Sequence, residues 1–309
     1  METGPQYKKD DPFKAAARWH QSEYRAHALK VGYRDYGNRL TEADGRALMN
    51  YYDGLGVREA LRERYPAYSG KRDADLLRSE HIPFNMLAPL AARPDMMPQV
   101  LREAFGLDLN QPIHMKIEWA PSPADAYLGD LTSFDTYIQG RDADGALAGV
   151  GIEVKYTERG YRIGSSEAGR VKDRTSAYWV TTRESGLFSR DRQEELAEDD
   201  LRQIWRNHLL GLAMVRRRDI DRFVSVTLYP SGNHHIADAL KKYRTHLKPS
   251  AQDSICGCTF EQYISSLRGD DEIEAWKNYL KKRYHFLKKR PPPDKRKMNP
   301  QKLIHHATN

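Results

Sequence analysis

Two short segments place acidic and basic side chains where they could hold a metal ion. Residues 133–139 and 150–156 alternate large apolar or β-branched residues with polar ones, a pattern typical of β-strands. Side chains two apart on a strand share a face, so Glu153 and Lys155 point to the same side of the second segment. In the first segment Asp135 points to the side opposite Phe134 and Thr136. If the strands pair, these groups meet on the sheet. Two carboxylates suit a hard cation such as Mg²⁺ and a lysine suits a phosphate, which predicts metal-assisted phosphodiester hydrolysis.

The link between the two segments favours their pairing. Asp144-Gly145 is a strong hairpin signal, and an antiparallel hairpin would set Asp135 near Glu153. An alternative is a salt-bridged surface, in which the two acids and Lys155 lie on an exposed sheet face without binding a metal. The order of the surrounding elements favours the metal site over that alternative.

Helices and further strands must position these residues. Helical patterns cover residues 12–31, 41–64 (one or two helices), 73–90, 94–105, 193–217, 235 onward, 259–267 and 271–287, and strand patterns cover 113–119 and 223–229. Residues 157–187 show little periodicity and are expected to form a loop, with room for a short helix, that is long enough to cover or approach a substrate.

A helix over residues 73–90 would put Glu80 on an apolar face with Leu76, Phe84 and Leu87, with a kink at Pro83. A carboxylate on such a face is unfavourable without a partner, which makes Glu80 a candidate functional residue. The alternative is that it lies at the edge of the stripe and reaches solvent.

The clearest helix, residues 193–217, carries both an apolar stripe and a polar flank. His208 falls within the stripe, which favours a packed core histidine over a metal ligand. Gln203 and Asn207 lie four apart on the flank, which could face the active edge of the sheet. His234 and His235 have no third ligand nearby in the sequence and are interpreted as loop histidines.

Composition excludes several classes of protein. Of the 309 residues 30% are charged, and the mean hydropathy is −0.80, so we expect a soluble protein without a membrane span or secretory signal. Cys256 and Cys258 are too close for an unstrained disulfide and too few for a structural zinc site, which predicts free thiols in a reducing cytoplasm.

The net charge of +7 is concentrated after residue 280, where the sequence has ten Lys and Arg residues and one Asp. Such a tail favours nucleic-acid binding, or it serves only as a solvated, disordered end.

The ordered arrangement resembles the PD-(D/E)xK nuclease superfamily, and more narrowly bacterial proteins described as putative restriction endonucleases. The resemblance covers about residues 75–285 and rests on Ser79-Glu80, Phe134-Asp135, residues 151–156 and residues 203–210. It implies an α/β fold with a mixed sheet and an α-β-β-β-α-β core, to which helices are added at both ends. We therefore expect an N-terminal helical region over residues 1–72, a nuclease-like domain over 73–287 and a basic, disordered tail over 288–309.

The resemblance also implies roles for individual residues. Asp135 and Glu153 would coordinate Mg²⁺, or Mn²⁺, with help from a backbone carbonyl at the end of the same strand. Glu80 would act as an outer or second-metal carboxylate. Lys155 would stay charged and would orient water and stabilise developing negative charge. Gln203 would contact the water or a phosphate.

Some alternatives stay open at this point. Phe134 stands where the family pattern has a proline, so Asp130 is a rival to Asp135 as metal ligand. The resemblance implies a DNA substrate, a role in restriction or phage defence, and a homodimer for cutting both strands. The alternatives are a catalytically inactive nucleic-acid-binding or scaffold protein that retains the fold, and another phosphate-transfer or RNA-cleaving enzyme.

Overall fold

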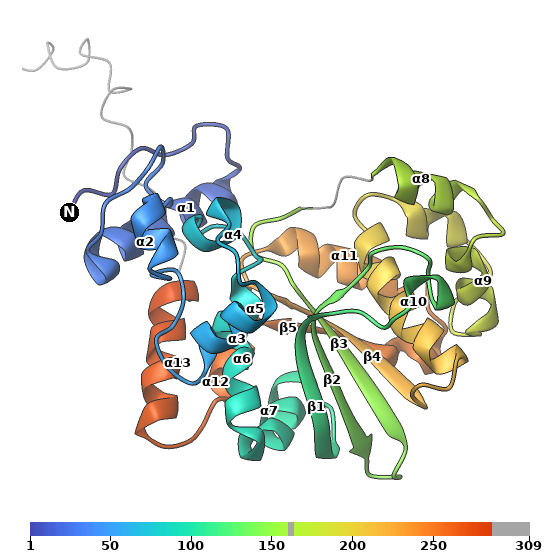
Figure 1. Ribbon diagram of the computed structural model, residues 1–309. Helices are drawn as coiled ribbons and strands as arrows, with labels where there is room; N and C mark the ends of the chain where they lie inside the picture. Colours follow the sequence, from blue (N-terminus) through green and yellow to red (C-terminus); the bar gives the residue numbers. More distant parts are fainter. Residues whose placement is uncertain (160–163, 286–309) are drawn as a thin grey trace, which may run out of the picture.

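A five-stranded mixed sheet forms the centre of the protein in the computed structural model, which describes residues 1–159 and 164–285 (Figure 1). Its strands lie side by side in chain order: β1 (Leu109–Trp119), β2 (Phe134–Asp142), β3 (Leu147–Val154), β4 (Arg222–Tyr229) and β5 (Ile255–Thr259). β1, β2 and β3 pair antiparallel, whereas β3, β4 and β5 pair parallel. The mixed sheet and the α/β class are as the sequence predicts.

The hairpin between β2 and β3 follows from its turn residues. The Asp142 side chain accepts hydrogen bonds from the backbone N–H groups of Asp144 and Ala146, both at 3.0 Å. Gly145 has a φ of +80°, which a glycine adopts without steric strain. The register pairs Thr136 with Ile152, so the predicted antiparallel hairpin is confirmed.

The sequence did not predict β5. This strand has only five residues and contains Cys256-Gly257-Cys258, which carries no alternating pattern of large residues. It is built by parallel pairing with β4, in which Val226 is opposite Cys256. Its formation therefore depends on a partner that the local sequence does not reveal.

Helices cover both faces of the sheet (Figure 1). None of those in the described residues is long and apolar enough to cross a membrane. In the N-terminal part they are α1 (Pro12–Glu23), the π-helix η1 (Tyr24–Leu29), α2 (Glu42–Arg46), α3 (Val57–Arg64), α4 (Gly70–Ala74), α5 (Ile82–Met86), α6 (Ala88–Ala92), η2 (Pro94–Met96) and α7 (Met97–Phe105). The later helices are η3 (Ala124–Ala126), α8 (Ser165–Lys172), α9 (Ala177–Glu184), η4 (Gln193–Ala197), α10 (Arg202–Arg216), α11 (His234–Arg244), η5 (Pro249–Ser254), α12 (Phe260–Ser266) and α13 (Asp271–Tyr284).

The expected helix over residues 73–90 is wrong. The chain leaves α4 at Asp75, turns through residues 76–81 and resumes as the short helices α5 and α6. Pro83 and Pro89 stand in the first turns of these two helices, where their missing N–H groups cost no hydrogen bond. The prolines therefore begin new helices instead of kinking one, and the face assigned to Glu80 does not exist.

Two other expectations need adjustment. Residues 165–184, expected as a loop with room for one short helix, contain the two helices α8 and α9, while residues 160–163 lie outside the described part. The expected tail over 288–309 also lies outside it. The boundary placed at residue 72 stays a prediction. Contacts cross it: the amide of Gln21 on α1 donates to the Tyr156 hydroxyl at 2.7 Å.

Glycines let α10 approach the sheet closely. A Cβ on Gly151 of β3 would lie 2.5 Å from the Phe134 ring and 2.8 Å from the Phe223 ring. A Cβ on Gly211 of α10 would lie 2.1 Å from the same Phe223 ring. Since real contacts of this kind are longer, only glycine fits at both positions. The close packing brings the polar flank of α10 within reach of β3.

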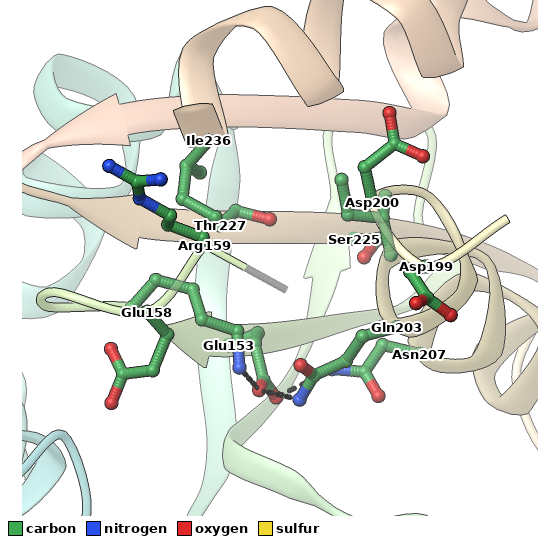
Figure 2. A pocket seen from close by; sticks show the side chains of 12 residues that line it. Glu153, Glu158, Arg159, Asp199, Asp200, Gln203, Asn207, Ser225, Thr227 and Ile236 are labelled. Carbon is green, nitrogen blue, oxygen red and sulfur yellow. Dashed lines mark hydrogen bonds and ion pairs between the residues drawn. The ribbon is translucent and has the colours of Figure 1, made fainter. Parts of the chain in front are cut away.

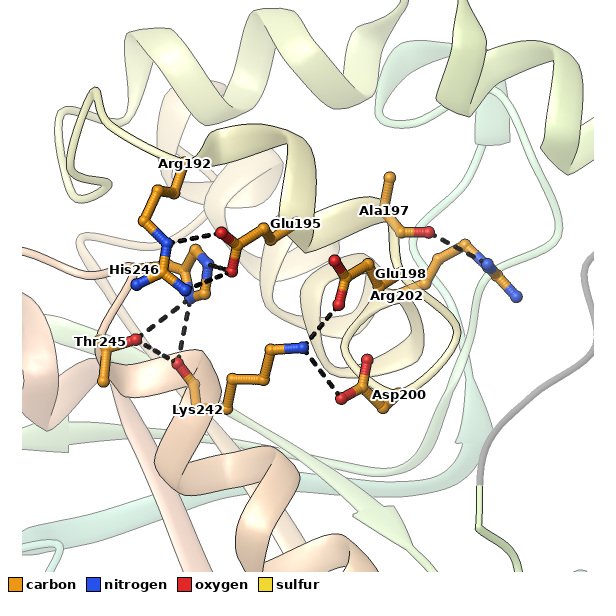
Figure 3. A network of polar contacts seen from close by, with 9 residues as sticks. All are labelled: Arg192, Glu195, Ala197, Glu198, Asp200, Arg202, Lys242, Thr245 and His246. Carbon is orange, nitrogen blue, oxygen red and sulfur yellow. Dashed lines mark hydrogen bonds and ion pairs between the residues drawn. The ribbon is translucent and has the colours of Figure 1, made fainter.

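A polar network holds the segment before α10 against α11 (Figure 3). The Lys242 ammonium of α11 donates to Glu198 at 2.5 Å and contacts Asp200 at 3.3 Å. Glu195 of η4 accepts from Arg192 at 2.5 Å and lies 3.3 Å from a ring nitrogen of His246. These contacts fix where α10 begins, and hence where its side chains meet the sheet.

Candidate active site

Asp135 and Glu153 stand opposite each other on β2 and β3. Thr136 pairs with Ile152, so the next position along the antiparallel register places Asp135 beside Glu153. Opposite residues of an antiparallel pair share a face, which sets both carboxylates on the same side. Asp135 Oδ2 also accepts a hydrogen bond from the backbone N–H of Val154 at 2.6 Å.

Three donors hold the Glu153 carboxylate in one orientation (Figure 2). Lys155 Nζ donates to Oε1 at 2.6 Å, and Gln203 Nε2 donates to the same oxygen at 2.5 Å. Asn207 Nδ2 donates to Oε2 at 2.5 Å. Glu153 is 9% exposed and Asn207 is 4% exposed, so these bonds form in a largely dry environment.

Gln203 and Asn207 reach Glu153 together because they are four residues apart on α10 and therefore lie on the same side of that helix. The sequence indicated a polar flank with both residues, and it assigned a site role only to Gln203. Asn207 makes an equally short bond to the other oxygen of Glu153. The spacing of four residues from Gln203 was the sequence signal for Asn207. The close approach of α10 to β3 brings that side of the helix to Glu153.

Burial shifts the pKa values of Asp135 and Lys155 in opposite directions, whereas the neighbouring carboxylates raise both. Burial, together with the charges of Glu153 and Glu118, raises the pKa of Asp135 well above its ordinary value. Burial alone would lower the pKa of Lys155, but the carboxylates of Glu153, Glu158 and Asp135 outweigh it and raise that pKa. Lys155 therefore stays protonated, as expected from the sequence.

Glu118, at the end of β1, is a residue that the sequence reasoning missed. Burial, followed by repulsion from Glu153, raises the pKa of Glu118 to about 7. The strand over residues 113–119 was expected, but no role was given to its acid. The available signal was the antiparallel order of β1, β2 and β3. That order places Glu118 next to Asp135, and Asp135 next to Glu153, on one face of the sheet.

Glu80 lies in the turn before α5 instead of on a helix. Its side chain is 45% exposed and forms an ion pair with Arg78 at 2.8 Å. Its charge acts on Glu118 in the same direction as that of Glu153, by raising the pKa of Glu118. Glu80 therefore belongs to the surroundings of the site, and its role as a ligand stays a prediction.

Asp130, the rival of Asp135, is engaged elsewhere. Its carboxylate accepts hydrogen bonds from the Thr132 backbone at 2.9 Å and from the Tyr178 hydroxyl, and it lies 3.5 Å from Arg206. Burial would raise the pKa of Asp130, but the bonds from Thr132 and Tyr178 and the charge of Arg206 lower it below the ordinary value. This geometry favours Asp135 as the metal ligand.

The cavity next to Glu153 is small. A cavity of about 20 Å³ is bounded by Glu153, Lys155, Gln203, Asn207 and Thr227, which leaves room for roughly one water molecule. Across residues 1–159 and 164–285, no group of three or more His, Cys, Asp or Glu side chains is gathered closely enough to hold a metal ion. The core of the site is therefore a pair of acids with one lysine and two amides.

The three histidines considered in the sequence lie in helices α10 and α11. His208 is fully buried in the apolar stripe of α10, with its Nδ1 3.0 Å from the Tyr243 hydroxyl, as expected of a core histidine. His234 and His235 form the first turn of α11.

Comparison with known proteins identifies a family. The model of the PD-(D/E)XK nuclease superfamily matches residues 8–286, which is most of the chain. No curated protein matches, and neither does a solved structure. The family match begins well before residue 73, so it includes the helices that precede the expected nuclease-like domain.

Proposed function

Because this chain belongs to the PD-(D/E)XK nuclease superfamily, we propose that it is a Mg²⁺-dependent endonuclease that hydrolyses phosphodiester bonds in DNA. The observation that carries this proposal is the pairing of Asp135 with Glu153 on adjacent strands, with Lys155 Nζ 2.6 Å from Glu153. The alternative of a salt-bridged, exposed sheet face is disfavoured, since Glu153 is nearly buried and bonded to α10.

The donor set fits a hard divalent cation. Asp135 and Glu153 supply carboxylate oxygens, and Val154, the last residue of β3, or Lys155, which follows it, offers a backbone carbonyl, with Glu80 as an outer acid. Oxygen donors of this kind suit Mg²⁺ or Mn²⁺. A bound cation of this class would make water more acidic and stabilise negative charge on phosphate.

The side chains around the acids have separate tasks. Lys155 is charged and lies beside Glu153, so it can bind a phosphate oxygen and stabilise the charge that develops there. Gln203 and Asn207 fix the orientation of Glu153, which leaves the carboxylate preorganised. The carbonyl oxygen of Gln203 remains as an acceptor for a proton of the attacking water.

A nucleic-acid substrate is supported by charge, and the choice of DNA follows from the resemblance. The segment after residue 280 carries ten basic residues and one acid, which attracts a polyanion without regard to sequence. A role in restriction or phage defence follows from the resemblance to putative restriction endonucleases. We further propose a cytoplasmic location and a homodimer that cuts both strands.

The test is a cleavage assay on plasmid DNA with Mg²⁺, with Mn²⁺ and with EDTA, and with an RNA substrate in parallel. We expect DNA cleavage that EDTA abolishes, and a loss of at least about 100-fold in Asp135→Asn and in Lys155→Ala. Glu63→Gln, at an exposed position of α3, serves as the control and should cleave like wild type.

Cleavage that survives both substitutions, or that resists EDTA, contradicts the site assignment. Preferential cleavage of RNA would move the chain to another substrate class on the same fold. Tight DNA binding with no uptake of Mg²⁺ or Mn²⁺ would support the non-catalytic binding alternative.

A further inference from the structure

Three carboxylates form a row across the antiparallel part of the sheet. In the β1–β2 ladder Ile117 pairs with Thr136 and Trp119 pairs with Phe134, so Glu118 is opposite Asp135. The β2–β3 register then places Asp135 beside Glu153. Adjacent strands are separated by about 4.8 Å. Asp135 is therefore the middle member of a row that begins at Glu118 and ends at Glu153.

The N-terminal helical region holds Glu118 at the outer end of this row. Arg64 Nε at the end of α3 donates to the backbone carbonyl of Glu118 at 3.0 Å, and the Tyr65 hydroxyl lies close enough to the Glu118 carboxylate to lower the pKa of that group. Glu118 has a φ of +52°, which is uncommon for a residue with a side chain and needs such support. The residues that precede the sheet thus fix a carboxylate next to the proposed site.

The two ends of the row differ in what surrounds them. Glu153 accepts bonds from Lys155, Gln203 and Asn207. Glu118 borders an open groove of about 410 Å³, whose lining also includes Arg64, Lys116 and Trp119. Glu118 is therefore one of the residues along a groove that opens to solvent, whereas Glu153 lies against the amides of α10.

We propose that Glu118 is a third carboxylate of the proposed metal centre, which acts from β1 beside Asp135 on the same class of hard divalent cation. Like charges directly opposite on neighbouring strands destabilise a sheet, and a cation between them removes that repulsion. As the middle member, Asp135 faces Glu153 on one side and Glu118 on the other. This inference depends on the proposed function and adds a ligand that the family resemblance did not assign.

One change of rotamer is needed. In the structure the Glu118 carboxylate lies beside the Tyr65 hydroxyl, and the three acids are not gathered around one point. Binding of the cation would draw the carboxylate from Tyr65 toward Asp135. Tyr65 therefore competes with the metal for Glu118, and its removal should favour metal binding.

The test is calorimetric titration of the full chain with Mn²⁺, together with the shift in melting temperature that Mn²⁺ produces. The variants are Glu118→Gln, Asp135→Asn and Tyr65→Phe, with Glu63→Gln, which changes an acid of the same groove, as the control. We expect Glu118→Gln to weaken Mn²⁺ binding about tenfold or more and to reduce the thermal shift. Tyr65→Phe should tighten binding by a few-fold, and Glu63→Gln should change neither quantity.

The outcomes separate this inference from the proposed function. If Asp135→Asn abolishes Mn²⁺ uptake while Glu118→Gln and Tyr65→Phe bind like wild type, Glu118 is not part of the centre and the proposed nuclease site stands. If the wild-type chain takes up no Mn²⁺, both proposals are wrong. If Glu118→Gln does not fold, unchanged Mn²⁺ binding by Tyr65→Phe overturns the inference.

Discussion

Two acidic regions of this protein handle buried charge in different ways. Asp130 and Glu167 lie among Arg202 and Arg206, with the Arg206 guanidinium 3.0 Å from Glu167 and 3.5 Å from Asp130. Asp135, by contrast, faces two further acids along the sheet, and Lys155 is the one cation among the groups that shift its pKa. The acids of the first region are paired with cations of the protein itself, whereas the second region holds more acidic than basic groups.

The pKa values express this difference. The pKa of Asp130 is lowered despite burial, because Thr132, Tyr178 and Arg206 stabilise its charged form. The pKa of Asp135 is raised well above its ordinary value by burial and by the neighbouring acids. A paired cluster is typical of structural support, and an excess of acid is typical of a place where a cation is to be added.

The largest expected effect is on the stability contributed by the cluster around Asp130 and Glu167. Arg206→Ala should lower the free energy of unfolding by about 3 kcal/mol, because it removes the cation that Asp130 and Glu167 share and leaves Arg202 as the cation paired with Glu167. Urea unfolding measures this change. The control is Arg216→Ala, whose pair with Glu184 is half exposed and is expected to contribute less than about 1 kcal/mol. Equal losses in the two variants would remove the distinction between a buried, balanced cluster and an ordinary surface pair.

Acid should reveal a third way of burying an ionisable group, which is to keep it neutral. Burial lowers the pKa of His208 to about 3 from an ordinary 6.5, so the unfolded chain binds the proton first as pH falls. Stability is therefore retained above pH 6.5 and lost below it, by about 2 kcal/mol between pH 7.5 and 5 for this group. Unfolding of wild type and His208→Gln at both pH values measures the slope. The same slope in both proteins would show that other groups dominate.

The amides of α10 should affect metal binding more than the fold. Asn207→Ala removes the donor to Glu153 Oε2, and we expect Mn²⁺ affinity to fall about tenfold because the carboxylate is no longer fixed. Gln193→Ala is the matched control, since that amide donates to the backbone carbonyl of Ser189 at 2.8 Å. Calorimetry with Mn²⁺ compares the two variants. Equal affinities would mean that Asn207 has only a packing role.

The smallest effect is expected at Glu80. Glu80→Gln should change stability by less than about 0.5 kcal/mol, because the pair with Arg78 is nearly half exposed to solvent. Cleavage should fall by less than in Asp135→Asn, in line with an outer carboxylate. A loss of cleavage as large as that of Asp135→Asn would place Glu80 directly on the metal. The group of acids around Asp135 would then extend into the turn before α5.

Local sequence was sufficient for the centre of the site. The alternation in β2 and β3 and the Asp144-Gly145 turn specified two strands and their antiparallel pairing, and with that the meeting of Asp135 and Glu153. The family match confirms the resemblance that those residues carried. The local sequence pattern was misleading at Glu80, because a helical period was assumed to continue past prolines that begin new helices.

The rest depended on contacts between distant segments. The sequence by itself determined which side chains share a face of a strand or helix, because those periods are properties of the backbone. Only the tertiary structure decided that α10 brings Asn207 to Glu153 and that Tyr65 and Arg64 hold Glu118 opposite Asp135. The order of strands and the approach of helices arise from packing of the whole core, and no local pattern encodes them.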